Sequence, residues 1–401
     1  MERPIPRRVV LAILCAAGAH ALSAPAQRVA APTPATPAPA TRRVARLDKP
    51  IRLPVWPVVN GLACIALDLV GLGDAAAALE ERFGGRVAPM SLGPDANPFV
   101  LLVHHRHGFD CWDPVRPVFE KLIVPEGFPA HPHRGFETVT MTLRGGLAHR
   151  DSAGVKRGST RERNSQLQRL RSRPVSTRVK ETYGDGDVQW LTAGKGILHE
   201  EMWHWADKSR RGECELYQLW VNLPAALSMS KPATEVLRAA DLATVAGDGV
   251  LETDLGGALT PDGAIRAPGA AREDVLLRKV ELAPGASYAR DVPADATALL
   301  YTRRGAVSVG GDAVPRHTLA YTERGAGSLR VTNDGDAPAE ILLLVGMPIR
   351  EPVVSSGTWV VSSEAELARA NADYGAGLLG RPWDHTISDG EWEEWNRKYG
   401  I

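Results

Sequence analysis

Two short stretches of the sequence carry pairs of side chains that could bind a metal ion. The stretch HPHRGFE contains His131 and His133, and the stretch DVQWLTAGKGILHEEM contains His199 and Glu201. Residues two apart on a β-strand point to the same face. Two such strands facing each other would bring three imidazoles and one carboxylate to one point. This set suits a divalent transition metal, and histidine with carboxylate and open positions is typical of non-haem Fe(II) oxygenases.

Other polar side chains nearby are alternative ligands. Glu137 is a rival carboxylate, because its i+4 spacing from His133 could also turn it toward a barrel interior. The run HHRH supplies His104, His105 and His107, but histidines clustered beside a loop lie more often at the surface or next to ligands. Burying three histidines and a glutamate without an ion would be costly. This cost favours a metal site over a purely structural polar network.

The composition indicates a soluble, turn-rich chain. Of 401 residues, 39 are glycine and 30 proline, which favours many turns and therefore β structure. The four cysteines are far apart and form no CxxC, so neither a zinc knuckle nor a disulfide framework is indicated. Net charge is zero, but the segments 1–47 and 156–180 are basic and contain one acidic residue each, which leaves an acidic body. An acidic body argues against binding along nucleic-acid phosphates.

The first 50 residues resemble a targeting presequence. Arg7 and Arg8 precede an apolar run, 9–17, and a small-residue stretch, the order found in a signal peptide. An Ala/Pro/Thr-rich segment without acidic residues follows, as in transit peptides. We therefore expect 1–50 to be a disordered bipartite presequence that directs the protein to a plastid. The alternatives are a secretion signal, a mitochondrial presequence and a disordered tail without a targeting role. We expect 51–86 to be a linker with a short helix and no membrane span.

Four blocks closely resemble pirin proteins of the cupin superfamily: HPHRGFETVT, HRDSAG, DVQWLTAGKGILHEEM and LYQLWVNLP. They occur in the family's order, and the resemblance covers roughly 90–350. It implies an all-β fold of two cupin (jelly-roll-type) β-barrels in tandem, a bicupin. It also implies one mononuclear non-haem iron in the N-terminal barrel, held by His131, His133, His199 and Glu201. By the same resemblance Arg134 and Glu137 would orient the ligands.

The resemblance also divides the chain. It gives an N-terminal cupin at 87–223, a C-terminal cupin at 224–350, and a crossover with a helix at 351–401. The C-terminal cupin has no counterpart of the HxH pair, so we expect no metal there, and its one histidine, His317, is expected at the surface. Ser363 and Glu366 have capping-box spacing for the final helix.

The basic segment 157–180 departs from the family. It has few apolar residues and no steady period, so it is expected to be disordered. It is either an intron retained in the predicted gene or a loop that binds an acidic partner. Its place in a hairpin makes an insertion tolerable if its ends stay close.

The resemblance implies three functions. The first is an Fe(II) dioxygenase that cleaves quercetin-type flavonols or related phenolics with O2, with Glu201 as candidate base. The second is a redox-sensitive regulator that binds a protein partner. The third is a metal-binding bicupin without catalysis. Another divalent metal could replace iron, because availability decides which ion is bound.

Overall fold

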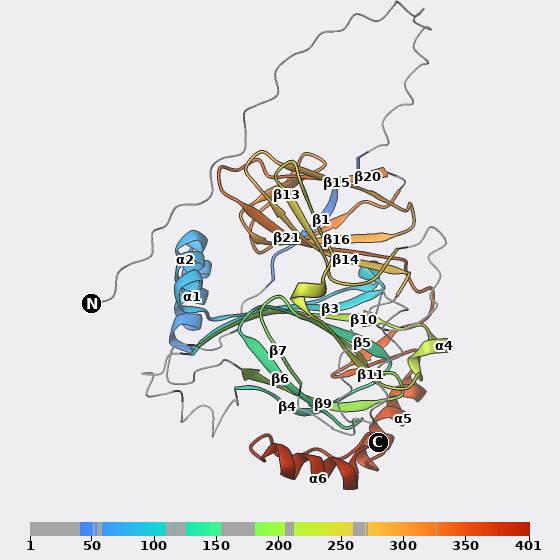
Figure 1. The fold of residues 1–401 in the computed structure, drawn as a ribbon. Helices are drawn as coiled ribbons and strands as arrows, with labels where there is room; N and C mark the ends of the chain where they lie inside the picture. Colours follow the sequence, from blue (N-terminus) through green and yellow to red (C-terminus); the bar gives the residue numbers. More distant parts are fainter. Residues whose placement is uncertain are drawn as a thin grey trace, which may run out of the picture. The chain divides into compact units, whose positions relative to one another are not determined.

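The computed structural model of the protein describes residues 41–50, 53, 58–109, 116, 126–153, 181–204, 212–259, 269, 272–325 and 327–401. These residues build an all-β fold of two cupins in tandem, as the sequence predicted (Figure 1). No helix among them is long and apolar enough to span a bilayer.

In the described part of the first cupin, a six-stranded sheet faces a four-stranded sheet. The larger has the order β11-β8-β5-β10-β3-β2, and the smaller has the order β4-β9-β6-β7. The larger sheet contains β2 (Arg86–Ser91), β3 (Phe99–Phe109), β5 (Phe136–Arg144), β8 (Val188–Thr192), β10 (Gly212–Asn222) and β11 (Ala233–Leu237). The smaller contains β4 (Gly127–His133), β6 (Gly146–Asp151), β7 (Glu181–Tyr183) and β9 (Ile197–His204).

The second cupin repeats this arrangement with a seven-stranded and a four-stranded sheet among the described residues. The larger sheet contains β1 (Val44–Asp48), β12 (Thr244–Gly247), β13 (Val250–Asp254), β14 (Val275–Leu282), β16 (Thr297–Arg304), β19 (Leu319–Thr322) and β21 (Ala339–Gly346). The smaller contains β15 (Ser287–Val292), β17 (Val307–Val309), β18 (Asp312–Val314) and β20 (Gly327–Thr332). Aliphatic side chains such as those of Val280, Leu300 and Ile341 fill the space between them.

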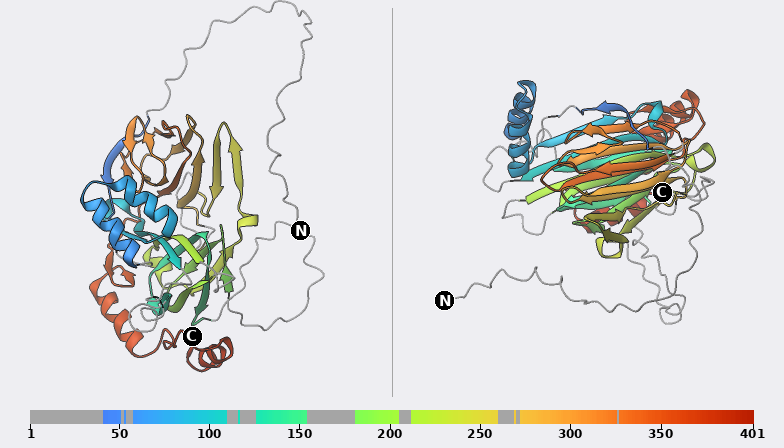
Figure 2. Two further views of the ribbon diagram at one scale, coloured as in Figure 1. Left: turned by 90° about the vertical axis from the view of Figure 1, so that its left-hand side faces the viewer. Right: turned by 90° about the horizontal axis from the view of Figure 1, so that it is seen from above.

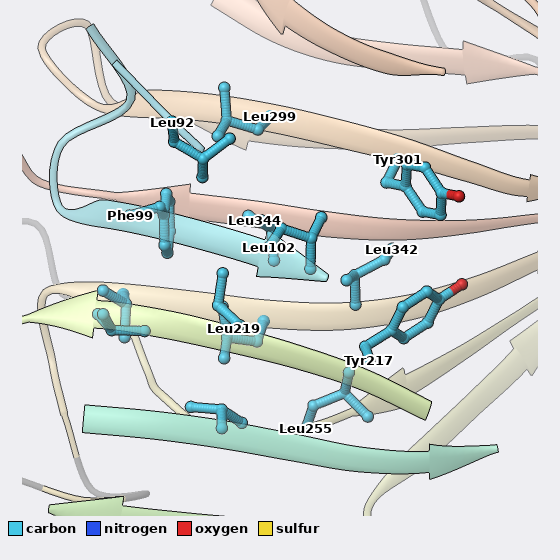
Figure 3. Packing of buried hydrophobic residues seen from close by; sticks show 14 of the residues in the cluster. Leu92, Phe99, Leu102, Tyr217, Leu219, Leu255, Leu299, Tyr301, Leu342 and Leu344 are labelled. Carbon is cyan, nitrogen blue, oxygen red and sulfur yellow. The ribbon is translucent and has the colours of Figure 1, made fainter. Parts of the chain in front are cut away.

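The two large sheets pack against each other back to back, in the layers seen in Figure 2. Leu102 and Leu219 of the first cupin meet Leu299 and Leu344 of the second in one buried cluster (Figure 3). Burying one such side chain contributes roughly 1.5–3 kcal/mol. The central strands of each large sheet are therefore buried on both faces, which explains why β21 is apolar from Ile341 to Gly346.

Strand β5 shows how alternation sorts its side chains between the two faces. Phe136 points into the first cupin, where its ring lies 5.0 Å from that of His133. Val139 and Met141, of the opposite parity, belong to the cluster between the two large sheets. The same period of two places His199 and Glu201 on one face of β9.

Two of the predicted boundaries, those at residues 50 and 223, need correction. β1 lies within the expected presequence, yet it pairs antiparallel with β19. Arg42 is only 4% exposed and donates to the carbonyls of Pro293 at 2.6 Å and Ala296 at 3.0 Å. Arg42 is thus a structural residue, and the fold begins before residue 50. At the other boundary, β11 pairs with β8, so the first cupin continues beyond residue 223.

The expected linker contains two helices, α1 (Val58–Leu69) and α2 (Gly73–Phe83), which pair with each other. Glu80 of α2 is fully buried and accepts from Arg86 of β2 at 2.8 Å. This ion pair attaches the helical hairpin to the edge of the first cupin.

Most of the two segments expected to be disordered lies outside the described residues: 1–40 of the presequence and the whole of 157–180. The strands that flank the second segment, β6 and β7, pair with each other. The two ends of that connection are therefore close together.

The C-terminal residues pack under the first cupin (Figure 1). A hairpin of β22 (Val354–Ser356) and β23 (Trp359–Val361) precedes α5 (Glu364–Gly375), whose Ser363 cap was predicted. A further helix, α6 (Asp389–Tyr399), was not predicted, although Ser388 and Glu391 form a complete capping box.

Candidate metal centre

Three of the four predicted ligands meet inside the first cupin. β4 carries His131 and His133, and it pairs with β9 so that His131 lies opposite His199. One ring nitrogen from each histidine lies within 4.8 Å of those of the other two. The Nε2 atoms of His131 and His199 are 3.0 Å apart. This separation matches two nitrogen ligands at right angles on one ion, each about 2.1 Å from it.

Backbone carbonyls fix the orientation of the two β4 imidazoles. Nδ1 of His131 donates to the carbonyl of Pro129 at 2.8 Å, and Nδ1 of His133 donates to that of Thr358 at 3.3 Å. Each Nε2 is then left as a lone-pair donor, as in metal sites where a second partner fixes the tautomer. Nε2 of His133 is buried and has no hydrogen-bond partner among the described residues. A metal ion would satisfy this atom.

Burial also keeps the three imidazoles neutral. It lowers the pKa of His131, and it lowers the pKa values of His133 and His199 well below the ordinary value. Neutral imidazole is the form that binds metals. Three neutral imidazoles with converging nitrogens, two of them buried and that of His131 half-buried, therefore fit a divalent transition ion.

Glu201, the fourth predicted ligand, is fully buried two residues from His199. Its carboxylate accepts hydrogen bonds from Tyr183 at 2.8 Å, Gln218 at 2.7 Å and Thr140 at 3.3 Å. The structure therefore places Glu201 beside the histidines, with its oxygens turned toward these three neutral donors.

The sequence analysis missed a histidine–aspartate pair beside the site. His149 of β6 lies with its ring 5.5 Å from that of His199. Its Nε2 is 3.0 Å from Oδ2 of Asp151, which also accepts from Thr234 at 3.0 Å. His149 and Asp151 both lie in the HRDSAG block and have the i, i+2 spacing, so the signal was present. Tyr183 and Gln218 were missed too, because neutral polar residues carry no such signal.

An aromatic wall lies on one side of the histidines. The ring of Trp220 is 5.3 Å from that of His133 and 4.5 Å from that of Phe136. Nε1 of Trp220 is buried and has no hydrogen-bond partner among the described residues. This wall could stack on a flat aromatic ligand and donate to one of its oxygens.

Arg134 and Glu137 do not orient the ligands through hydrogen bonds in the described structure, contrary to our expectation. Arg134 instead donates to the carbonyl of Lys195 at 2.6 Å and to Asp373 of α5 at 2.8 Å. Glu137 accepts from Arg272 at 3.1 Å on the face of the sheet opposite to the histidines. Both residues tie other segments to the first cupin.

Four histidines for which we expected the surface, or for the HHRH run also a place next to the ligands, are buried. His104 is fully buried, with Nδ1 3.0 Å from the Tyr301 hydroxyl and Nε2 2.9 Å from Glu215. His105 and His107 are each 5% exposed and stack on each other inside the first cupin. His317 is only 7% exposed, because the α1–α2 hairpin covers it.

Comparison with known proteins gives consistent matches over both cupins. Residues 93–171 and 176–221 match the Pirin family model, and residues 277–380 match the model of the Pirin C-terminal cupin domain. A pirin-like protein of Caulobacter vibrioides is 34% identical over 297 residues, which are 73% of this chain and 92% of the relative. Human pirin is 32% identical over 256 residues, 62% of this chain and 77% of the relative.

Among solved structures, a quercetin 2,3-dioxygenase from Acinetobacter baumannii is similar with a TM-score of 0.61 and 25% identity. The match covers 85% of this chain and 99% of that one. The family matches cover more than half of the sequence, and a relative above 30% identity is matched over nearly its whole length. The chain therefore belongs to the pirin family of cupin proteins.

Proposed function

We propose that this protein is a mononuclear Fe(II) dioxygenase that opens quercetin-type flavonols or related phenolics with O2. The observation that carries the proposal is the group of three neutral histidines, two buried and one half-buried, next to a buried carboxylate in one cupin. The similarity to the Acinetobacter baumannii quercetin 2,3-dioxygenase supports the substrate class.

His131, His133 and His199 would hold the ion, with Glu201 as a further ligand or as the base. When bound, the ion supplies Lewis-acid catalysis and a template for the reactants. Glu201 would accept the proton of the substrate hydroxyl, because it is a buried carboxylate two residues from His199 on β9. Phe136 and Trp220 would stack on the flat ring system of the substrate.

The proposed reaction balances without an external reductant. O2 adds to the deprotonated flavonol, two carbon–carbon bonds of the central heterocycle break, and one ring carbon leaves as CO. Both atoms of O2 remain in the ester product. The protein therefore has to bind, deprotonate and shield the substrate, but it does not need to deliver electrons.

The test is O2 uptake with quercetin by the iron-loaded full chain. We expect O2 and flavonol to disappear in equal amounts, and we expect His133→Ala to lose both metal and activity. His385→Ala, in the partly exposed C-terminal segment, is the control and should retain both. A fully iron-loaded protein that consumes no O2 with quercetin or other flavonols would overturn the enzyme proposal. That result would favour a regulatory, non-catalytic role.

We also propose that residues 1–40 direct the protein to a plastid. The support is their signal-like and transit-like composition, together with a fold whose first strand begins at Val44. A fluorescent fusion of residues 1–40 tests this proposal. Plastid fluorescence is expected, whereas secretion or a diffuse cytosolic signal would contradict it.

A further inference from the structure

The carboxylate of Glu201 is enclosed by neutral donors from three different strands. Tyr183 of β7 donates to Oε1 at 2.8 Å, and Thr140 of β5 donates to the same oxygen at 3.3 Å. Gln218 of β10 donates from Nε2 to Oε2 at 2.7 Å. Glu201 is fully buried, so no water replaces these bonds at low cost. We call Tyr183, Thr140 and Gln218 the carboxylate cradle.

The cradle competes with the histidine group for the carboxylate. The ring nitrogens of His131, His133 and His199 gather within 4.8 Å of one another, and no oxygen of Glu201 joins that group. A carboxylate has about four lone-pair positions. The cradle uses two on Oε1 and one on Oε2. Hydrogen bonds to an ionised group are about twice as strong as neutral ones.

Two strands place the strongest donors on opposite sides of the carboxylate. Gln218 projects from the large sheet, where β10 alternation directs it inward between Leu216 and Trp220. Tyr183 projects from the small sheet and also lies 3.3 Å from Oε1 of Gln189. The carboxylate is therefore held between the two sheets of the cupin, and it cannot turn without losing a bond.

We propose that Tyr183 and Gln218 are positioning residues that hold the Glu201 carboxylate back from the bound ion. In this arrangement they weaken the bond between Glu201 and the ion and keep the carboxylate available as a proton acceptor. The inference rests on the metal centre of the proposed function. It adds that neutral residues distant in sequence control whether the Glu201 carboxylate acts mainly as a metal ligand or mainly as a base.

Titration of the metal-free full chain with Co(II) tests the proposal, because the visible absorption of Co(II) weakens as its coordination number rises. Tyr183→Phe and Gln218→Leu each remove one cradle bond and preserve the side-chain size. Each variant should bind Co(II) about 2- to 10-fold more tightly, the equivalent of one net hydrogen bond. Each should also show weaker visible absorption per bound ion.

Two controls separate positioning from a general structural effect. In the Glu201→Gln background, Tyr183→Phe should no longer change the affinity or the spectrum. Tyr217→Phe removes a buried hydroxyl next to Gln218 on the opposite face of β10, and it should leave Co(II) binding unchanged.

The possible failures are distinguishable. A wild-type protein that binds no Co(II) would overturn the metal centre and with it the proposed function. A wild-type protein that binds one Co(II), with unchanged or weaker binding in both Tyr183→Phe and Gln218→Leu, would overturn only the positioning role. An equal gain in affinity in the Glu201→Gln background would also overturn it.

Discussion

The imidazole of His133 donates from Nδ1 to the carbonyl of Thr358, 225 residues further along the chain. This bond makes the C-terminal hairpin a part of the metal centre. Arg134, the next residue, forms an isolated bridge with Trp359, and Trp359 packs with Leu198 beside the site. The C-terminal segment thus fixes one ligand, in addition to covering apolar surface.

Gly135→Ala should separate this hairpin from the site. Gly135 has φ +90°, and an added Cβ would lie 1.8 Å from the carbonyl oxygen of Val360. We expect a loss of about 3 kcal/mol in unfolding free energy and weaker metal binding. Urea denaturation and metal titration measure the two effects.

Gly285→Ala is the matched control for this substitution. Gly285 has φ +76°, but an added Cβ would meet no atom within 4 Å. This variant should lose only about 1–2 kcal/mol in unfolding free energy, from backbone strain alone, and its metal affinity should be unchanged. Equal metal affinities in the two variants would show that the hairpin does not position His133.

Glu137→Ala should destabilise the protein strongly without removing the metal. Glu137 and Arg272 are both fully buried and lie 3.1 Å apart, and Glu137 also accepts from the Thr192 hydroxyl at 2.7 Å. Asp274 still pairs with Arg272 in the variant, but the buried donors that Glu137 satisfied lose their acceptor. We expect a loss of about 2–4 kcal/mol in unfolding free energy, because at least two buried donors are left unsatisfied. The partly exposed pair of Lys279 and Glu281 provides the control, because Glu281→Ala should lower the unfolding free energy by less than about 1 kcal/mol. Loss of the metal from folded Glu137→Ala protein would instead make Glu137 a ligand.

Stability should fall in mild acid because of buried neutral histidines outside the metal site. Burial lowers the pKa of His104 to about 4 and that of His107 to about 3. The unfolded chain binds protons near pH 6.5, whereas the folded chain does not. The stabilisation is therefore complete above pH 6.5 and is lost as the pH falls toward the folded pKa values. At pH 5 each histidine should lower the unfolding free energy by about 2 kcal/mol relative to its value above pH 6.5.

His107→Phe tests this pH dependence. The ring nitrogens of His107 have no hydrogen-bond partner among the described residues, and its neighbours include Phe109 and Trp203. The difference in unfolding free energy between pH 7.5 and pH 5 should shrink by about 2 kcal/mol relative to wild type. His385→Ala should leave this difference unchanged, and an unchanged difference in His107→Phe as well would exclude His107 as a cause.

Alternation along strands explains what the sequence predicted about the site. His131 and His133, and likewise His199 and Glu201, share a face because each pair lies two apart on one strand. The same alternation does not extend from His133 to Glu137, for a local reason. β4 ends at His133 and β5 begins at Phe136, so the positive φ of Gly135 resets the alternation between them.

Long-range packing explains what could not be predicted. The position of Thr358 depends on a crossover that returns the chain to the first cupin, and no local pattern gives its register. His317 looked isolated in the sequence, but Glu80 and Arg86 approach it in the folded chain. Arg42 looked like part of a targeting presequence, but four backbone carbonyls of the second cupin accept hydrogen bonds from its guanidinium.

The most direct test of the account is the dependence of quercetin oxidation on Fe(II) added to the metal-free full chain. Activity should rise linearly with iron and reach its maximum at one equivalent per chain. His131→Ala, which removes one of the three converging nitrogens, should show neither bound iron nor activity. Saturation at two equivalents, or an undiminished rate in His131→Ala, would contradict a single catalytic metal centre in the N-terminal cupin.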